Sequence, residues 1–121
     1  MGKEKLLENS EAERLLSEGL RLAGSSKKKD RALAAEYFEK ALELGCETAA
    51  YPMAVCFESG EGVKKDTKKA EKLYRRAAES GDARGWNALG AYLEEGAKAD
   101  MAQAIAAYRK AADMGDVWGL C

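Results

Sequence analysis

The sequence predicts an all-α protein, a right-handed α/α superhelix (a short solenoid) built from three helix–turn–helix repeats. Three observations support this prediction: an alanine–aromatic–alanine pattern recurs three times, each copy ends in a glycine, and the chain has a single proline. The glycines Gly45, Gly81 and Gly115 stand 36 and 34 residues apart. Self-similarity with a period of this length is typical of stacked helical hairpins.

The second helix of each repeat carries the clearest pattern. Its alanines and its aromatic residue stand four and three residues apart, which places them on one face of a helix. These helices are expected at about 31–44, 67–80 and 101–114. An aspartate precedes each of them, where its carboxylate can accept hydrogen bonds from free backbone N–H groups. The three aspartates are Asp30, Asp66 and Asp100.

The first helix of each repeat has a weaker pattern, in which a small residue follows one large apolar residue and precedes another. These helices are expected at about 11–23, 48–59 and 83–95. The small residues are Ser17, Ala54 and Gly90. We interpret them as points where a neighbouring helix passes close by, so that a bulky side chain would overpack.

The first two copies of this helix each contain an irregular feature. In the first copy, Leu16 and Leu20 supply the apolar positions, and Ser10 and Glu13 have the spacing of a capping box that starts a helix. In the second copy, Pro52 is tolerated if it lies in the first turn, because the N–H groups there have no helical partner.

The repeats are expected to form one domain covering residues 1–121, with boundaries near 11–45, 46–81 and 82–115. Residues 116–121 resemble the opening of a further first helix and would begin a truncated fourth repeat. Solenoids normally finish with a polar cap. An uncapped C-terminal end would expose an apolar face, so a homo-oligomer formed through this end is one expectation.

Composition and charge disfavour several classes of function. Twenty basic residues oppose 21 acidic ones, so no excess charge draws the chain to nucleic acid or to a membrane. The absence of histidine removes the commonest general base and the commonest metal ligand. No nucleophile–base pair can be named. We therefore expect no catalytic residue, no metal site, no cofactor and no enzymatic activity.

The three cysteines, Cys46, Cys56 and Cys121, match neither a zinc-binding spacing nor a disulfide framework. We expect reduced thiols and a cytoplasmic protein, since no apolar run could span a membrane and the N-terminus has no apolar signal core. Cys56 is expected to be buried, Cys46 more exposed, and Cys121 the most reactive. A Cys46–Cys56 disulfide stays open as an alternative.

The middle repeat carries a specific combination of motifs. A Gly-x-Gly-Val loop at 60–63 is followed by Lys-Ala-x-x-Leu-Tyr at 69–74 and by Ala-Ala-x-x-Gly at 77–81. This stretch resembles a Sel-one-like repeat, a relative of the tetratricopeptide repeat with a longer loop between its helices. The resemblance covers most of residues 12–119. It implies an α/α superhelix that acts as an adaptor or scaffold for protein complexes.

In a solenoid of this type the first helices line the concave side, and residues that flank their core stripe point into it. The candidate partner-binding residues are Arg14, Glu18 and Arg21 in the first repeat, Thr48, Tyr51, Val55 and Glu58 in the second, and Arg84, Asn87, Ala91 and Glu94 in the third. Such a surface could hold a peptide through side-chain hydrogen bonds and one aromatic anchor. We therefore expect a non-catalytic protein–protein interaction module with a protein or peptide partner.

Other interpretations remain open. The chain could be a self-associating or array-continuing repeat unit, or the regulatory domain of a partner enzyme. Seven basic residues between Lys64 and Arg76 could contact phosphates or an acidic partner, but no aromatic side chains interleave with them on the outer face. We therefore expect no nucleic-acid binding. Gly60 and Gly62 are interpreted as turn formers, since no strand precedes them as a phosphate-binding loop requires.

Overall fold

The computed structural model describes the backbone of residues 2–95 and 101–114, and the side chains of residues 10–94 and 101–113. These residues form six α-helices and one short 3-10 helix, with no strand among them. The helices are α1 (Gly2–Ala23), α2 (Lys28–Glu43), η1 (Glu47–Ala49, 3-10), α3 (Ala50–Ser59), α4 (Thr67–Glu79), α5 (Ala83–Glu95) and α6 (Met101–Met114). The predicted all-α fold is confirmed.

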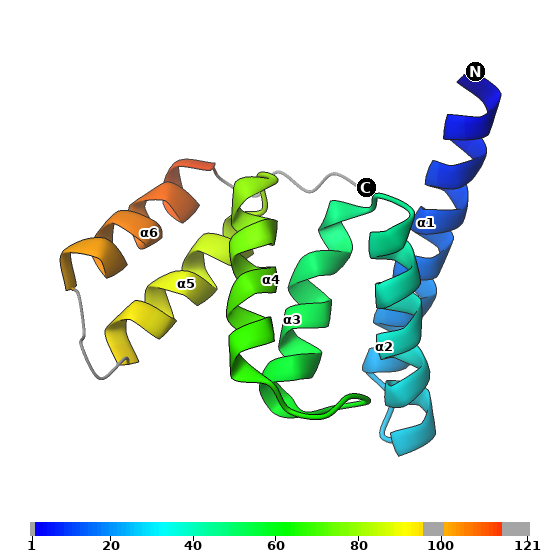
Figure 1. Cartoon of the computed structure of the whole chain (residues 1–121), viewed down its shortest axis with the longest axis horizontal. Helices are drawn as coiled ribbons and strands as arrows, with labels where there is room; N and C mark the ends of the chain where they lie inside the picture. Colours follow the sequence, from blue (N-terminus) through cyan, green and yellow to red (C-terminus); the bar gives the residue numbers. More distant parts are fainter. Residues whose placement is uncertain (1, 96–100, 115–121) are drawn as a thin grey trace.

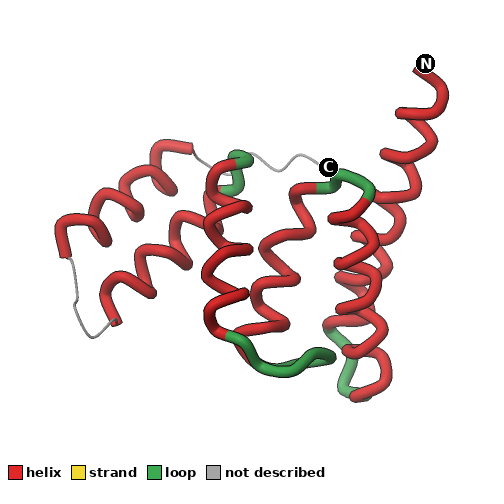
Figure 2. The backbone as a smooth tube through the Cα atoms, viewed as in Figure 1, coloured by secondary structure: helices red, strands yellow, loops and turns green. Residues whose placement is uncertain are grey.

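The helices pack as consecutive pairs along the molecule (Figure 1). α1 packs on α2, α3 on α4, and α5 on α6, and α4 also packs extensively against α5 of the next pair. In the described part of the chain the loops alternate between the two ends of these pairs (Figure 2). This arrangement is the stack of helix–turn–helix units that the sequence period predicts.

An aromatic ring of the second helix packs directly on a small residue of the first helix. A Cβ atom on Gly19 of α1 would lie 2.6 Å from a ring carbon of Phe38, and one on Gly90 of α5 would lie 2.8 Å from a ring carbon of Tyr108. The corresponding residue of α3 is Ala54, which is fully buried. The close approach predicted at Gly90 is therefore confirmed, and Ala54 is buried as predicted.

The first helix differs from the prediction in its register. The pattern places Ser17 at the close approach, but Ser17 is exposed and Gly19 occupies that position. Leu20, predicted in the core, is 49% exposed. The register differs because the loop after α1 is shorter than the loop after α3. Residues 24–27 join α1 to α2, whereas residues 60–66 join α3 to α4, so aligning the two repeats by their loop sequences misplaces the residues of α1.

Two helices begin earlier than predicted. α1 starts at Gly2, so Ser10 lies inside the helix and the predicted capping box does not start it. The N-terminal turns of α1 project beyond α2 (Figure 1). α2 starts at Lys28, so Asp30 lies in its first turn and accepts a hydrogen bond from the Ser25 hydroxyl at 2.7 Å instead of capping the helix.

The other described helix ends agree with the predictions. Asp66 caps α4 by accepting a hydrogen bond from the backbone N–H of Lys69 at 3.1 Å. Gly45 and Gly81 have φ values of 92° and 105°, the left-handed conformation expected after α2 and α4. Pro52 is the third residue of α3, in the first turn, where its missing N–H group is tolerated.

Some predicted features lie outside the described residues. They are the third loop with Asp100, the turn at Gly115, the opening of a fourth repeat at 116–121, and Cys121.

The cysteines correct two expectations, both about Cys46, and confirm one about Cys56. Cys56 is buried and free, as predicted, and burial raises the pKa of its thiol to about 11, which keeps the thiol protonated. Cys46 is 1% exposed and disulfide-bonded. The predictions that Cys46 is more exposed and reduced are therefore wrong, and a Cys46–Cys56 bond does not form. Because disulfides persist in oxidising compartments, the cytoplasmic expectation loses its support from the thiols.

Gly85 sets the approach of α5 to α4. A Cβ atom on Gly85 would lie 2.4 Å from the backbone nitrogen of Ala78 and 2.6 Å from the carbonyl oxygen of Tyr74. Both are backbone atoms of a helix, so they cannot rotate away as the end of a side chain could. The second and third repeats can therefore pack at this distance only with glycine at this position.

Replacement of Gly85 by alanine is expected to lower the free energy of unfolding by about 1–3 kcal/mol, the usual cost of overpacking, although alanine favours a helix. Urea unfolding followed by circular dichroism measures this loss. The matched control is Gly24→Ala, because the nearest atom to a Cβ there is 3.6 Å away. Equal stabilities of the two variants would contradict the steric argument.

An ion pair ties α4 to the start of the second repeat. The Nε and Nη2 atoms of Arg76 donate hydrogen bonds to the two carboxylate oxygens of Glu47 at 2.7 and 2.8 Å. These hydrogen bonds are the main cause that holds the pKa of Glu47 below its usual value of 4.5. They also raise the pKa of Arg76.

The lowered pKa of Glu47 implies a pH-dependent contribution to stability. The contribution is present above the unfolded pKa of 4.5 and is lost as pH falls through the lower folded pKa. Arg76→Met should therefore cost under about 1 kcal/mol at neutral pH, since the pair is half exposed, and nothing in strong acid. Urea unfolding over a pH series measures the difference. Arg75→Met, at an exposed position with no ion-pair partner among the described residues, should show no such trend.

Candidate functional site

The candidate site is the face formed by the first helices of the repeats, α1, α3 and α5. The positions that correspond in successive repeats are set by the close-approach residues Gly19, Ala54 and Gly90. The residue after each of these defines a row that we name the apolar row: Leu20, Val55 and Ala91. Corresponding positions of a solenoid follow one another along one surface, so these side chains belong to the same strip.

The apolar row contains two exposed large apolar side chains. Leu20 is 49% exposed and Val55 is 39% exposed, while Ala91 is half-buried. A single exposed apolar side chain is common, but exposure at the same position of two successive repeats is a feature of the surface. The sequence predicts Val55 and Ala91 as site residues, and it misses Leu20 because the register of α1 is shifted. The signal that could have found Leu20 is its place directly after a glycine.

Tyr51 and Arg84 are brought together across α3 and α5. The guanidinium carbon of Arg84 lies 4.3 Å from the centroid of the Tyr51 ring, a cation–π contact. The carboxylate of Asp82 accepts two hydrogen bonds from this guanidinium, at 3.0 and 2.7 Å. Both predicted residues are half-buried. They therefore form a fixed edge of the site and not a freely moving pair.

Tyr51 also belongs to a series of packed tyrosines. Its ring centroid lies 5.6 Å from that of Tyr74, which lies 5.9 Å from that of Tyr92, and both pairs are tilted. The three rings come from α3, α4 and α5. The sequence indicates Tyr51 as an aromatic anchor, but the structure shows that part of its surface is already used in packing. Tyr92 packs against the same cluster.

Two predicted carboxylates are engaged within the fold. The Tyr74 hydroxyl donates a hydrogen bond to Glu58, and the Tyr108 hydroxyl donates one to Glu94 at 2.8 Å. Burial, followed by the hydrogen bond to Glu58, raises the pKa of the Tyr74 phenol, which stays protonated. Each glutamate therefore joins the end of a first helix to the second helix of the same repeat, and only its remaining acceptor sites face solvent.

The first repeat lacks both partners of this hydrogen bond. Phe38 stands in the tyrosine position and has no hydroxyl, and Ala23 stands in the glutamate position, four residues after Gly19. The carboxylate and the hydroxyl are thus present together in two repeats and absent together in the first. This correspondence supports the interpretation of Glu58 and Glu94 as structural residues.

The remaining predicted residues are dispersed. Arg14 and Asn87 are exposed, and Thr48 is half-buried in η1. Arg21 and Glu18 form an ion pair at 2.7 Å that lies within α1 and does not link α1 to another helix. The structure therefore brings the residues of α3 and α5 together more closely than those of α1.

The face of α1, α3 and α5 can bind another molecule through non-covalent contacts. The side chains described in the structure contain no group of three or more cysteine, aspartate or glutamate residues placed to hold a metal ion. Within the same residues, no helix has both the length and the apolar content to cross a membrane. What the face offers to another molecule is exposed apolar surface beside an amide, carboxylates and guanidinium groups.

Comparison with solved structures shows similar helical repeats in three bacterial proteins. A Sel1 repeat protein from Oxalobacter formigenes has a TM-score of 0.74 and 28% identity, over 84% of this chain and 43% of that one. The protein c5321, a protective antigen of uropathogenic Escherichia coli strains with an SLR fold, has a TM-score of 0.76 and 32% identity, over 93% and 25%. Cysteine rich protein B of Helicobacter pylori has a TM-score of 0.69 and 26% identity, over 95% and 88%.

The first two of these proteins are longer, so this chain spans less than half of their length. No curated protein matches the chain. The family model named Sel1 repeat matches three stretches, residues 10–46, 48–82 and 87–116. Proteins with this repeat are typically non-enzymatic scaffolds that mediate protein interactions. Since the match covers most of the sequence, the chain belongs to the Sel1 repeat family.

Proposed function

We propose that the protein is a non-catalytic interaction module that binds a peptide segment of a partner protein on the face of α1, α3 and α5. The exposed apolar row carries this proposal. Leu20 and Val55 leave apolar surface in water at equivalent positions of two repeats. Covering that surface with an apolar side chain of a partner is favourable at about 25 cal/mol per Å².

Polar groups beside the row supply orientation. The amide of Asn87 is exposed and can both donate to and accept from the backbone of an extended peptide. Tyr51 and Arg84 are already held by their neighbours, so their contribution requires little ordering on binding. The combination of an apolar strip with a few fixed polar groups is typical of peptide-binding grooves in helical repeats.

Family membership supports the class of function but not the partner. Sel1 repeats commonly mediate protein interactions, and their scaffold role agrees with an adaptor that has no catalytic residue, metal or cofactor of its own. The names of the similar structures indicate no shared ligand. We therefore propose a protein or peptide partner defined by an apolar side chain that fits beside Val55.

Peptides selected on an array for binding to the wild-type protein should bind Val55→Glu and Leu20→Glu at least about tenfold more weakly, because each charge replaces apolar contact surface. Fluorescence polarisation measures the affinity, and circular dichroism checks the fold. Asn87→Ala should also weaken binding. Tyr51 is unsuitable for this test, because its ring packs on Tyr74.

The matched control is Leu33→Glu on α2, whose side chain is 37% exposed and lies outside the apolar row. It should bind the selected peptides as the wild type does. The proposal fails if the row variants and the control keep equal affinity for every selected peptide.

A second candidate function, self-association or continuation of the array, is favoured by α6. Met101 and Ile105 are 52% and 48% exposed. In the alignment of the repeats, Met101 and Ile105 correspond to Arg31 and Ala35 of α2. In the second repeat, the loop residue Gly62 packs against α2 at these two positions. We infer that a repeat of the same kind, such as a second copy of this chain, would cover α6.

Sedimentation velocity over a range of concentrations tests this second candidate. The wild-type protein should show a concentration-dependent increase in sedimentation coefficient, and Ile105→Glu should remove it, because a charge on the contact surface is costly to bury. Leu33→Glu again serves as the control. A wild-type protein that stays monomeric over the whole range would rule out self-association.

A further inference from the structure

A basic surface, which we name the loop end, lies where the α1–α2 and α3–α4 loops come together at one end of the molecule (Figure 1). Its exposed lysines are Lys27, Lys28, Lys29, Lys64, Lys65, Lys68 and Lys69. The whole chain has a net charge of −1, so this positive charge is a local concentration and not a general property. A local field of one sign attracts ligands of the opposite sign.

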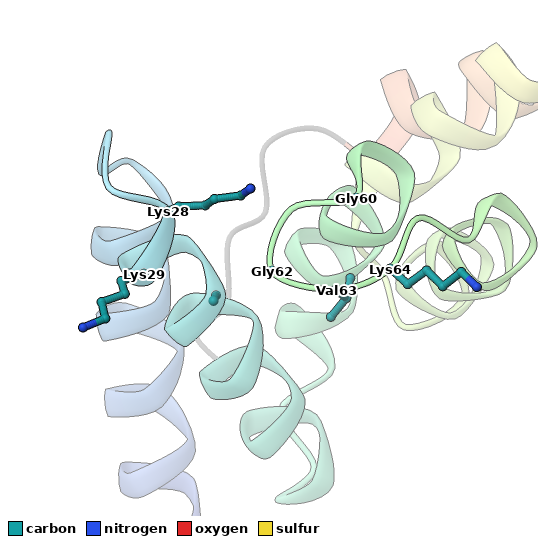
Figure 3. A pocket seen from close by; sticks show the side chains of 7 residues that line it. Lys28, Lys29, Gly60, Gly62, Val63 and Lys64 are labelled. Carbon is teal, nitrogen blue, oxygen red and sulfur yellow. The ribbon is translucent and has the colours of Figure 1, made fainter.

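A shallow, wide-open cavity of about 570 Å³ lies between the two loops. Lys28, Lys29 and Lys64 contribute to its lining, together with Ala32, Gly60, Gly62 and Val63. In Figure 3 Lys28 extends from the first turn of α2 toward the side of the second loop, whereas Lys29 and Lys64 extend away on either side. The cavity is therefore lined by small apolar and backbone groups beside Lys28, while Lys29 and Lys64 carry positive charge onto the surface on either side of it.

The loop end is fixed before any ligand binds. Gly62 has a φ of 76°, and a Cβ atom on it would lie 2.8 Å from the carbonyl oxygen of Arg31, so the second loop lies directly on α2. Arg31 donates hydrogen bonds to the carbonyl oxygens of Ser25 and Ser26, at 3.1 and 3.0 Å, and pairs with Glu61 at 3.3 Å. One guanidinium thus ties both loops together, which lowers the entropy cost of ligand binding.

The acidic groups of the loop end, which are fewer than its lysines, offset only part of their charge. Glu61 pairs with Arg31, the carboxylate of Asp30 accepts from a serine hydroxyl, and Asp66 caps α4. Among the described residues, Lys28 and Lys64 have no carboxylate within ion-pair distance. Their charge is therefore available to a ligand from outside the chain.

We infer that the loop end binds an acidic segment of a partner protein, at a site separate from the apolar row. Several carboxylates spaced along an extended peptide can meet lysines that are spread over two repeats. The only arginine of the loop end is Arg31, and its guanidinium already binds groups of the chain. No arginine is therefore free at the loop end to bind a phosphate group through two parallel hydrogen bonds. The cavity lining contains no aromatic side chain for stacking bases and no large exposed apolar side chain for insertion into a membrane.

The test uses a short fluorescein-labelled peptide of alternating glutamate and serine, and a second peptide in which glutamine replaces glutamate. Fluorescence polarisation at about 0.15 M ionic strength, where exposed charges act over only about 8 Å, should show binding of the glutamate peptide at least about tenfold tighter than that of the glutamine peptide. The double variant Lys28→Glu with Lys64→Glu should lower the affinity for the glutamate peptide by about tenfold or more, with an unchanged circular dichroism spectrum.

The matched control carries the same change of net charge elsewhere. Lys40→Glu with Arg75→Glu alters exposed residues nearer the C-terminal ends of α2 and α4, and it should leave the affinity within about twofold of the wild type. Val55→Glu should also leave it unchanged, which separates this site from the apolar row. Equal losses in the two double variants, or no preference for glutamate, would overturn the inference. Tighter binding of a single-stranded oligonucleotide or of phosphatidylserine vesicles than of the glutamate peptide would also overturn it.

Discussion

The packing of an aromatic ring on a residue with almost no side chain determines the geometry of each repeat. At Gly19 and Gly90 a single added carbon would lie within 3 Å of the ring of Phe38 or Tyr108. This steric requirement selects one face of the first helix for the interior, and the residues on the other face are exposed as a consequence. The apolar row is therefore a result of packing: Leu20 and Val55 are exposed because the preceding residue must be small and buried.

The same requirement explains which charged groups are available to a partner. In the second and third repeats the ring is a tyrosine whose hydroxyl reaches the end of the first helix, where Glu58 or Glu94 accepts its hydrogen bond. Arg31, Arg76 and Arg84 are likewise engaged, in pairs with carboxylates of the chain. Exposed charge alone is thus a poor guide to function here. The lysines of the loop end differ, because among the described residues Lys28 and Lys64 form no ion pair with a carboxylate of the chain.

The sequence predicted the limits of those helices that begin and end at residues recognisable from the nearby sequence. The expected limits of α5 and α6 agree with the structure, and Asp66 caps α4, because spacing, capping residues and closing glycines act within a few residues. The first repeat was harder to predict. The sequences at 24–30 and 60–66 look alike, but only the second forms a loop throughout, because residues 28–30 already belong to α2. The disulfide-bonded state of Cys46 was not predicted, because the spacing of the cysteines in the sequence matches no disulfide framework.

The two proposed surfaces differ in the physical range of their interactions, and this difference assigns them different roles. The charge of the lysines at the loop end acts over roughly 8–10 Å at physiological ionic strength, so it influences how often and in which orientation a partner arrives. The apolar row acts only on direct contact, so it influences how long the partner stays. Because Arg31 and Gly62 fix the loop end to α2, which packs directly on α1, a partner oriented by the lysines is presented to a rigid first-helix face.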